Sequence, residues 1–345
     1  MSALPKISTN TAQRNVRFSA FGSPDVLEVA VGEVPEPGAG EVRIRVEASS
    51  VQFTDTLIRR GLYPDLPKRS AYTPGYDAVG VVEALGDGVS AFAVGDRVAD
   101  LTMVGGNARY LIRPAAGLVA VPERVDAAEA TTLVLSWLTA YQALFRTAEL
   151  KKGERVLVIG GNGSVGLAAI ALAVRAGHEV YATAREVHHE RLRGLGAIPL
   201  PRDAWQATLA ELGGADVVLD GIAADGFRST WAALREGGRL VGIGASAAAG
   251  RGSKLEAIVA FVRLLIGFRL RFWDNRSARF YSITDERRAK PEQFRDDLAK
   301  LFGWLDEGAI QPRVDERLTL NEIADAHARL EAGGLSGKLV VFPWR

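Results

Sequence analysis

A glycine-rich segment carries the clearest chemical signal in the sequence. It reads ERVLVIGGNGSVGLAAIALAVRAG, and its glycines have the spacing G-x-G-x-x-G between an apolar β-branched run and an apolar run of helical character. In such a turn Gly161 permits the tight bend, Gly163 lets the backbone approach a pyrophosphate, and Gly166 permits close packing of helix on strand. The first amides of the helix would bind phosphate through their free N–H groups and the positive end of the helix dipole. The predicted phosphate-binding residues are Gly161, Asn162, Gly163, Ser164, Val165 and Gly166. The alternative is a turn that binds nothing, which the flanking strand and helix disfavour.

The end of the following strand indicates which dinucleotide binds. Enzymes that use NAD place a carboxylate there on the ribose hydroxyls, whereas enzymes that use NADP place cations on the 2′-phosphate. The segment reads VYATAREVHHER: it has no acid in Val180–Ala184, and Arg185 follows, where a guanidinium could bind a phosphate through two hydrogen bonds. Glu186 is the competing ribose ligand, and a solvated Arg185 is the other alternative. We predict NADPH, bound in part by Arg185.

This turn requires a parallel sheet, and the sequence around it supplies the pattern of one. The expected strands are Arg155–Ile159, Glu179–Ala184, Asp216–Asp220 and Arg239–Ile243, with Arg279–Ile283 at the edge. A helix with Asp126 as its N-cap precedes them. Further upstream, β-branched runs cut by Gly and Pro predict an antiparallel, β-rich domain, to which the C-terminal strand GKLVVF is expected to return. The predicted fold class is α/β.

Composition excludes several other chemistries. The 345 residues, 48% of them apolar, suffice for two domains, and a formal net charge of +1 gives no field that would attract nucleic acid or an anionic membrane. The absence of cysteine excludes disulfides, thiolate zinc sites and a cysteine nucleophile. The longest apolar run, Leu255–Leu270, is interrupted by Arg263 and Arg269 and is shorter than the roughly 20 residues that cross a bilayer. The polar N-terminal stretch lacks the apolar core of a secretory signal. We therefore expect a cytoplasmic protein with no membrane span.

Several stretches, in their order and spacing, resemble one protein family. They are SSVQFTDTLIRRGLYP, TPGYDAVGVVEALGDGVSAFAVGDRVA, LTAYQAL, GERVLVIGGNGSVGLAAIALA and GLSGKLVVFP. Together they resemble the zinc-independent quinone oxidoreductases of the medium-chain dehydrogenase/reductase superfamily, from about Val16 to Phe342. The segment LYPDLPK and the tail from Ser253 to Trp304 look most like the branch of VAT-1-type proteins.

The resemblance implies two domains with a cleft between them, and no metal. A GroES-like substrate domain would span residues 1–125 and 290–345, with an NADP-binding Rossmann domain, a doubly wound parallel sheet, inserted at residues 126–289. Zinc-dependent relatives carry a cysteine ligand and a Gly-His-Glu stretch, whereas this chain has Gly75-Tyr76-Asp77 and no cysteine. Its four histidines, at positions 178, 188, 189 and 327, have no metal-ligand spacing to another candidate.

The resemblance also implies residues at the site of hydride transfer. Tyr63 matches the active-site tyrosine of the family and would donate a hydrogen bond to the substrate carbonyl, or would only line the site. Gln52, the second predicted catalytic residue, stands where relatives usually have an asparagine beside the nicotinamide. Thr139 matches a residue that approaches the nicotinamide; its alternative is a hydroxyl bonded to its own helix. Gly244 and Ala245 match the segment beside the nicotinamide half of the cofactor.

The implied reaction is hydride transfer from NADPH to a quinone or an α,β-unsaturated carbonyl. Such an acceptor delocalises the developing charge, so that positioning and a proton donor are the main requirements. The alternatives are a specialised enoyl or tailoring reductase of a biosynthetic pathway, and a dinucleotide-binding scaffold or sensor with little turnover. Arginines and aromatic residues alternate between Arg263 and Phe280, which suggests an oligomer contact or a lid in preference to an RNA or lipid surface. Relatives imply a homodimer through the edge strand. Asp55 and Arg59 are expected to form a structural charge pair.

Overall fold

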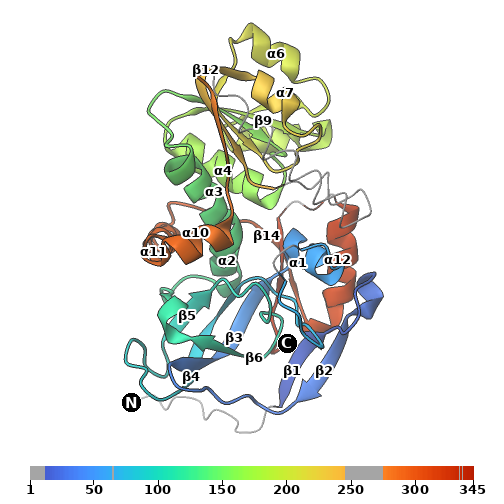
Figure 1. Cartoon of the computed structure of the whole chain (residues 1–345), viewed down its shortest axis with the longest axis vertical. Helices are drawn as coiled ribbons and strands as arrows, with labels where there is room; N and C mark the ends of the chain where they lie inside the picture. The colour runs from blue at the N-terminus through green and yellow to red at the C-terminus, as the bar shows by residue number, and fades with distance from the viewer. Residues whose placement is uncertain (1–11, 64–65, 245–274, 334, 336) are drawn as a thin grey trace. The chain divides into compact units, whose positions relative to one another are not determined.

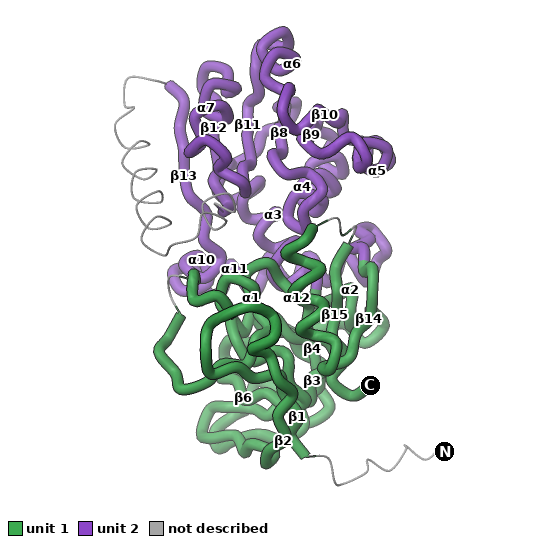
Figure 2. The backbone as a smooth tube through the Cα atoms, turned by 90° about the vertical axis from the view of Figure 1, so that its right-hand side faces the viewer, with its two compact units in different colours: residues 1–131, 314–345 green, residues 132–313 purple. Residues whose placement is uncertain are grey.

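The chain divides into two compact units in a computed structural model, which describes residues 12–63, 66–244, 275–333, 335 and 337–345. Unit 1 comprises residues 1–131 and 314–345, and unit 2 comprises residues 132–313 (Figure 2). The chain therefore leaves unit 1, builds unit 2 and returns, as the sequence indicated for its C-terminal strand. The predicted insert, residues 126–289, is shorter than unit 2, which extends to residue 313 and so includes residues 290–313 that were predicted for the first domain.

Unit 1 is β-rich. Its strands are β1 (Gln13–Arg17), β2 (Glu28–Gly32), β3 (Glu41–Ser50), β4 (Ala78–Leu85), β5 (Arg97–Asp100), β6 (Tyr110–Pro114), β7 (Val119–Ala120), β14 (Val314–Leu318) and β15 (Lys338–Val341). The larger sheet has the order β14-β15-β3-β4-β5-β7, with β6 also paired to β3, and β1 and β2 form a hairpin-like pair (Figure 1). β15 pairs antiparallel with β3, with Val340 opposite Ser50.

The alternation of buried apolar and partly exposed polar residues along β3 explains why this sheet forms. Val42, Ile44, Val46 and Ala48 are buried at every second position, while the intervening side chains are partly exposed, as expected for a strand with one face on the core. The short helices of unit 1 are η1 (Pro24–Val26), α1 (Phe53–Arg59), η2 (Ala115–Gly117), η6 (Leu320–Glu322) and α12 (Ile323–Ala332). α12 packs against α1 and η1.

Unit 2 holds a six-stranded sheet whose strands are all parallel. They are β8 (Arg155–Ile159), β9 (Glu179–Ala184), β10 (Ile198–Pro201), β11 (Ala215–Asp220), β12 (Leu234–Gly242) and β13 (Ser277–Phe280). The order β10-β9-β8-β11-β12-β13 reverses direction between β8 and β11, which is the strand order of a doubly wound dinucleotide-binding sheet. The predicted α/β fold class is confirmed.

Helices connect these strands. They are α4 (Ser164–Arg175), η5 (Glu186–His188), α5 (His189–Gly194), α6 (Gln206–Glu211), α7 (Arg228–Ala232), α10 (Ile283–Ala289) and α11 (Pro291–Asp306). Ahead of β8, one continuous helical run is built from α2 (Ala127–Thr132), the π-helical η3 (Leu133–Trp137), α3 (Leu138–Gln142) and the π-helical η4 (Ala143–Thr147). Asp126 caps this run as predicted, because its Oδ1 accepts from the backbone N–H groups of Ala128 and Glu129. π-Helical turns within a helix are frequent near functional sites.

Strand prediction succeeded where the apolar runs were continuous. Arg155–Ile159 and Glu179–Ala184 are strands with the predicted limits, and β13 is the parallel edge strand, although it begins and ends earlier than Arg279–Ile283. β10 was missed because Pro199 and Pro201 interrupt it; proline is tolerated there because β10 is the opposite edge. Within the described residues no helix is long and apolar enough to span a membrane, and the run Leu255–Leu270 lies outside them.

Candidate active site

The glycine-rich turn joins β8 to α4 with the geometry that phosphate binding requires. Gly160 has a φ of 78°, a left-handed conformation that favours glycine, and Gly163 is the N-cap of α4. The amides of Ser164 and Val165 therefore lie in the first turn of a 12-residue helix, where N–H groups have no partner within the helix. The structure thus places a helix N-terminus, a type of site that can bind an anion, at the predicted position.

Close packing explains why the turn needs its glycines. A Cβ added to Gly166 would lie 2.4 Å from the carbonyl oxygen of Gly160 and 2.9 Å from Cα of Gly161. A Cβ added to Gly161 would lie 2.8 Å from Cβ of Ala182. A Cβ at Gly163 would lie 3.3 Å from the carbonyl oxygen of Gly160, so this position is crowded too, although less than the other two.

The end of β9 is bonded to this turn. The Gly161 N–H donates to the carbonyl oxygen of Thr183 at 2.9 Å, and the Gly160 N–H donates to the Thr183 hydroxyl at 3.1 Å. Arg185 follows β9 directly and is exposed. Its position next to the turn is the one that the sequence predicted for a 2′-phosphate ligand.

Arg185 belongs to a cluster of basic side chains. Its Nη2 lies 3.5 Å from Nε2 of His188, and Arg191 Nη1 donates to Oδ1 of Asn162 in the turn at 3.1 Å. Burial, and then the charges of Arg185, Arg191 and His189, lower the pKa of His188. A bound phosphate group would relieve this repulsion, so the cluster is suited to an anion.

Gly244, another predicted cofactor-binding residue, lies at the carboxyl edge of the sheet. Asp220 ends β11, and its carbonyl oxygen accepts from the Ile243 N–H at 2.9 Å. Gly244 follows, and a Cβ there would lie 3.2 Å from the carbonyl oxygen of Gly221. Because ligands of doubly wound sheets bind at the carboxyl ends of the strands, Gly244 lies at the expected edge. Ala245 lies outside the described residues.

Tyr63 forms a hydroxyl pair in unit 1. Its hydroxyl lies 2.6 Å from the hydroxyl of Tyr76, and the two rings meet edge to face with centroids 5.9 Å apart. Tyr76 is 1% exposed, whereas Tyr63 is partly exposed. Of the two tyrosines, only Tyr63 is therefore partly accessible.

The side-chain amide of Gln52 has its hydrogen bonds within unit 1. Its Nε2 donates to Ser50 Oγ at 2.5 Å and to Asp77 Oδ2 at 2.7 Å, and its Oε1 accepts from Nζ of Lys338. Asp77 accepts further bonds from the Ser50 N–H and hydroxyl, at 2.7 and 2.6 Å. Gln52 is 3% exposed. Both amide donors and the carbonyl of Gln52 thus have partners inside this unit.

Burial dominates the electrostatics of this network. The pKa of Asp55 is raised to about 7 by burial, against which the N–H groups of Gln52 and Gly75 lower it. Burial also raises the pKa of Asp77 and lowers that of Lys338 to about 8, while the attraction between Lys338 and both carboxyl groups opposes these shifts. One buried cation therefore serves two buried carboxyl groups.

The expected charge pair between Asp55 and Arg59 is wrong. Asp55 accepts from the backbone N–H groups of Gln52 and Gly75, at 2.8 and 3.0 Å, because it caps the first turn of α1. Arg59 instead donates to Glu331 on α12 at 2.6 Å.

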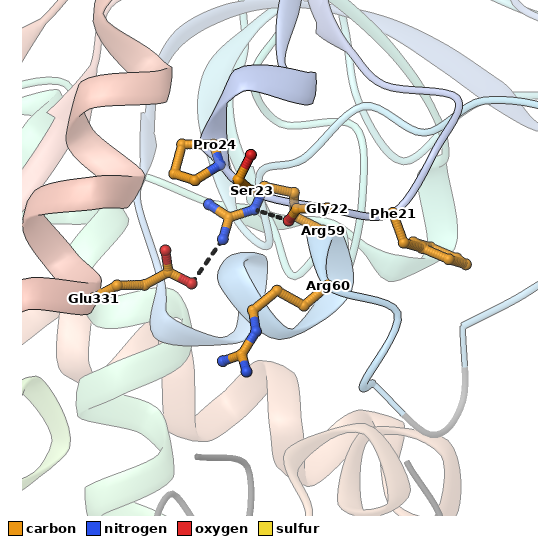
Figure 3. Close-up of a pocket in the computed structure, with 7 residues that line it drawn as sticks. All are labelled: Phe21, Gly22, Ser23, Pro24, Arg59, Arg60 and Glu331. Atoms are coloured by element: carbon orange, nitrogen blue, oxygen red, sulfur yellow. Dashed lines mark hydrogen bonds and ion pairs between the residues drawn. The ribbon is translucent and has the colours of Figure 1, made fainter. Parts of the chain in front are cut away.

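A pocket of about 390 Å³ lies next to this arginine, within unit 1 (Figure 3). It is lined by Phe21, Gly22, Ser23, Pro24, Arg59, Arg60 and Glu331. The guanidinium of Arg59 also donates to the carbonyl oxygen of Gly22 at 3.0 Å and so joins α1 to the loop before η1. None of the predicted site residues lines this pocket.

Thr139 lies on α3, which packs against α4, the helix that begins at the glycine-rich turn. Its side chain is buried, and its interaction with the Tyr281 hydroxyl partly offsets the rise that burial causes in the pKa of Tyr281. The expected alternative was a bond to its own helix; the described partner is a residue from the segment between β13 and α10.

Sequence reasoning missed three residues that complete these networks. Lys338 had a detectable signal: a lysine at the start of the otherwise apolar strand KLVV must be paired if it is buried. Tyr76 was noted only as a departure from a zinc motif, and Tyr281 has no local signal.

Among the described residues no group of three or more His, Asp or Glu side chains is arranged to hold a metal ion.

A glycine-rich turn at the carboxyl edge of a sheet with this strand order defines a dinucleotide-binding protein. Two family models match the chain: the alcohol dehydrogenase GroES-like domain over residues 38–123, and the zinc-binding dehydrogenase over residues 195–341. Human quinone oxidoreductase is 31% identical over 342 residues, which cover 95% of this chain and 97% of that protein.

Solved structures that are similar to this chain include proteins of the same kinds. The human synaptic vesicle membrane protein VAT-1 homolog-like protein has a TM-score of 0.80 at 26% identity, covering 97% of this chain and 99% of that one. A mycobacterial protein solved in complex with NADPH has a TM-score of 0.81 at 30% identity, covering 96% and 100%. The chain belongs to the medium-chain dehydrogenase/reductase superfamily, with quinone oxidoreductases and VAT-1-like proteins among its relatives. Its GroES-like domain and its Rossmann domain are as predicted.

Proposed function

We propose that this protein is an NADPH-dependent oxidoreductase that reduces a quinone or an α,β-unsaturated carbonyl without zinc. The observation that carries the proposal is the glycine-rich turn with its basic cluster at the end of β9. The full-length similarity to quinone oxidoreductases, and to a mycobacterial protein solved with NADPH, supports it.

NADPH fits the residues at the carboxyl edge of unit 2. The first amides of α4, which begins after Gly163, suit a pyrophosphate, and Arg185 with His188 suits a 2′-phosphate. When bound, this cofactor supplies the hydride. Thr139 and Gly244 are the residues proposed for its nicotinamide half.

Tyr63 supplies the hydrogen bond and the proton to the substrate oxygen. The buried Tyr76 hydroxyl lies 2.6 Å from the Tyr63 oxygen, and either hydroxyl can donate in this pair. In the proposed reaction Tyr76 donates, which leaves the Tyr63 hydrogen for the substrate. The same bond stabilises negative charge on the Tyr63 oxygen while its proton is shared with the substrate.

Gln52 acts as a positioning residue. Its amide is bonded to Ser50, Asp77 and Lys338, so it holds the start of α1 rather than a substrate. Asp77 lies in the stretch that replaces the Gly-His-Glu of zinc-dependent relatives, and here it belongs to a network of an amide, a carboxyl and an ammonium group. This is the reason for proposing a reaction without zinc.

The test is NADPH oxidation against a panel of quinones and α,β-unsaturated ketones. Wild type should reduce members of the panel, and Tyr63→Phe should lower kcat/KM by about a hundredfold, the low end of the range for a general acid. Tyr76→Phe should cause a smaller loss, and Tyr110→Phe, a change at another buried tyrosine of unit 1, should cause none. Unchanged rates in Tyr63→Phe would remove its proton-donor role. Tight NADPH binding without reduction of any acceptor would refute the reductase and favour a dinucleotide-binding scaffold.

A further inference from the structure

Three arginines of unit 1 lie on neighbouring segments of the backbone. Arg14 is in β1, Arg45 is in β3, and Arg109 directly precedes β6. The Arg109 N–H donates to the carbonyl oxygen of Arg14 at 2.8 Å, and the Arg109 carbonyl oxygen accepts from the Val46 N–H at 2.9 Å. All three arginines are partly exposed. The fold therefore gathers three cationic side chains from distant parts of the sequence.

An indole ring joins two of these arginines. The guanidinium carbon of Arg45 lies 4.3 Å from the centroid of the Trp344 ring, and that of Arg109 lies 4.7 Å from it. Trp344 is held against β3, because its Nε1 donates to the carbonyl oxygen of Val46 at 2.8 Å, and Arg109 Nε donates to the carbonyl oxygen of Pro343 at 3.2 Å. Trp344 thus holds both guanidinium groups in place through cation–π contacts.

The surface of β3 shows that ion pairing is the rule at the neighbouring positions. Arg43, Arg45 and Glu47 are alternate residues of the strand and share its partly exposed face. Arg43 pairs with Glu83 at 2.9 Å, and Glu47 pairs with Arg97 at 2.7 Å. Arg45 lies between them and forms no ion pair with any of the described residues. Its charge is therefore not balanced as the charges on either side are.

The other two arginines also have only neutral partners. Arg14 Nη2 donates to the side-chain oxygen of Asn321 at 3.3 Å, and Arg109 donates to the carbonyl oxygen of Pro343. Within the described part of the chain, neither forms an ion pair with an acidic side chain. Burial, and then the charges of Arg14 and Arg45, lower the pKa of Arg109. The three cations therefore repel one another, and an anion bound among them would relieve this repulsion.

We propose that Arg14, Arg45 and Arg109, held by Trp344, bind a phosphate group of a small molecule. A guanidinium can bind two phosphate oxygens at once, and a doubly charged anion suits a cluster of three cations better than a single carboxylate does. The ligand is small because the cluster is confined to three side chains and the formal net charge of the whole chain is only +1, which gives no extended field for a polyanion. None of the residues proposed for the cofactor or the substrate belongs to this site.

The experiment titrates inorganic phosphate into the full chain by isothermal calorimetry, with and without NADPH. Because NADPH would occupy the glycine-rich turn, phosphate that binds in both titrations does not bind at that turn. Wild type should bind one such phosphate with a dissociation constant of about 1 mM or lower. The affinity should fall at least about fivefold when NaCl is raised from about 0.03 M to about 0.3 M, because salt screens partly exposed charges.

Three variants test the assignment to these side chains. Arg45→Met and Arg109→Met should each weaken phosphate binding at least about fivefold, through the loss of a charge-assisted hydrogen bond at a partly exposed site. Arg14→Met should have a similar effect, and it serves if the variants that change the contacts of Trp344 do not fold. Arg17→Met is the matched control: it removes the same charge from an exposed position of β1 and should change the affinity less than about twofold.

The outcomes decide between a site and a general effect of charge. Absence of a heat of binding up to about 10 mM phosphate would refute the proposal. An equal loss of affinity in Arg17→Met and in Arg109→Met would show attraction by net charge and no site. If a single-stranded oligonucleotide binds through the three arginines far more tightly than phosphate does, the small ligand is wrong and a nucleic acid replaces it. The proposal does not depend on reductase activity, so a chain that reduces no quinone could still support it.

Discussion

Replacing Lys338 with methionine should destabilise the protein in a pH-dependent way. Lys338 is the buried cation that faces Asp55 and Asp77 and donates to Gln52. Its loss leaves two buried carboxyl groups without a counter-charge, and breaking a buried pair in this way costs about 3–5 kcal/mol. We expect the free energy of unfolding of Lys338→Met to be lower than that of wild type by about this amount at pH 7.5.

The pKa shifts determine how this cost changes with pH. The pKa of Asp55 is about 7 in the folded protein, above its value in an unfolded chain, so its contribution to stability is present at low pH and is lost as the pH rises through 7. At pH 5 Asp55 is protonated and needs no cation. At pH 7.5 it is ionised, and the charge of Lys338, whose own pKa is about 8, stabilises it. The cost should therefore be at least about 1 kcal/mol smaller at pH 5, the equivalent of roughly one pKa unit.

Urea unfolding followed by circular dichroism at pH 5, 6 and 7.5 measures this difference. Lys152→Met, at an exposed lysine, is the control and should show no pH-dependent cost. Adding Asp55→Asn to Lys338→Met should remove most of the pH dependence. A cost that is equal at all three pH values, or larger at pH 5, would refute the assignment of Lys338 as the cation of this network.

Three further predictions concern single side chains. Gly166→Ala should weaken NADPH binding at least about tenfold in a fluorescence titration. The added Cβ would lie 2.4 Å from the Gly160 carbonyl oxygen and distort the turn. Undiminished binding would show that the turn does not hold the nucleotide. The pKa of His327 is lowered to about 3, first by burial and then by Arg59, so the free energy of unfolding of wild type should fall as the pH decreases from about 6.5 towards 3. His327→Gln should lack this decrease in urea unfolding. An equal decrease in wild type and in His327→Gln would contradict the prediction. Arg59→Met should raise the pKa of the His327 ring in an NMR titration, since the arginine charge is then gone, and an unchanged value would exclude that electrostatic effect.

Local sequence was sufficient for the Rossmann core. The strand at Arg155–Ile159, the turn after it and the helix from Ser164 are consecutive, and each is encoded by residues within one segment. β10 could not be recognised because its two prolines argue against a strand unless its place at the edge of the sheet is known.

The networks at the site depend on tertiary contacts that sequence patterns do not contain. Gln52 is bonded to Lys338, which is 286 positions away, and Tyr281 to Gln142, which is 139 positions away. The resemblance predicted Gln52 as a site residue but not the partners that bind its side-chain amide. The homodimer and the cytoplasmic location remain predictions.

The central claim is most directly tested by the selectivity for NADPH over NADH. Dissociation constants of both nucleotides would be measured for wild type, Arg185→Ala and Arg193→Ala, the last a control at an exposed arginine on the neighbouring helix. Wild type should prefer NADPH, and Arg185→Ala should reduce this preference at least about tenfold through loss of a charge-assisted hydrogen bond, while Arg193→Ala keeps it. Equal binding of NADPH and NADH by wild type, or an unchanged preference in Arg185→Ala, would contradict the proposed cofactor site.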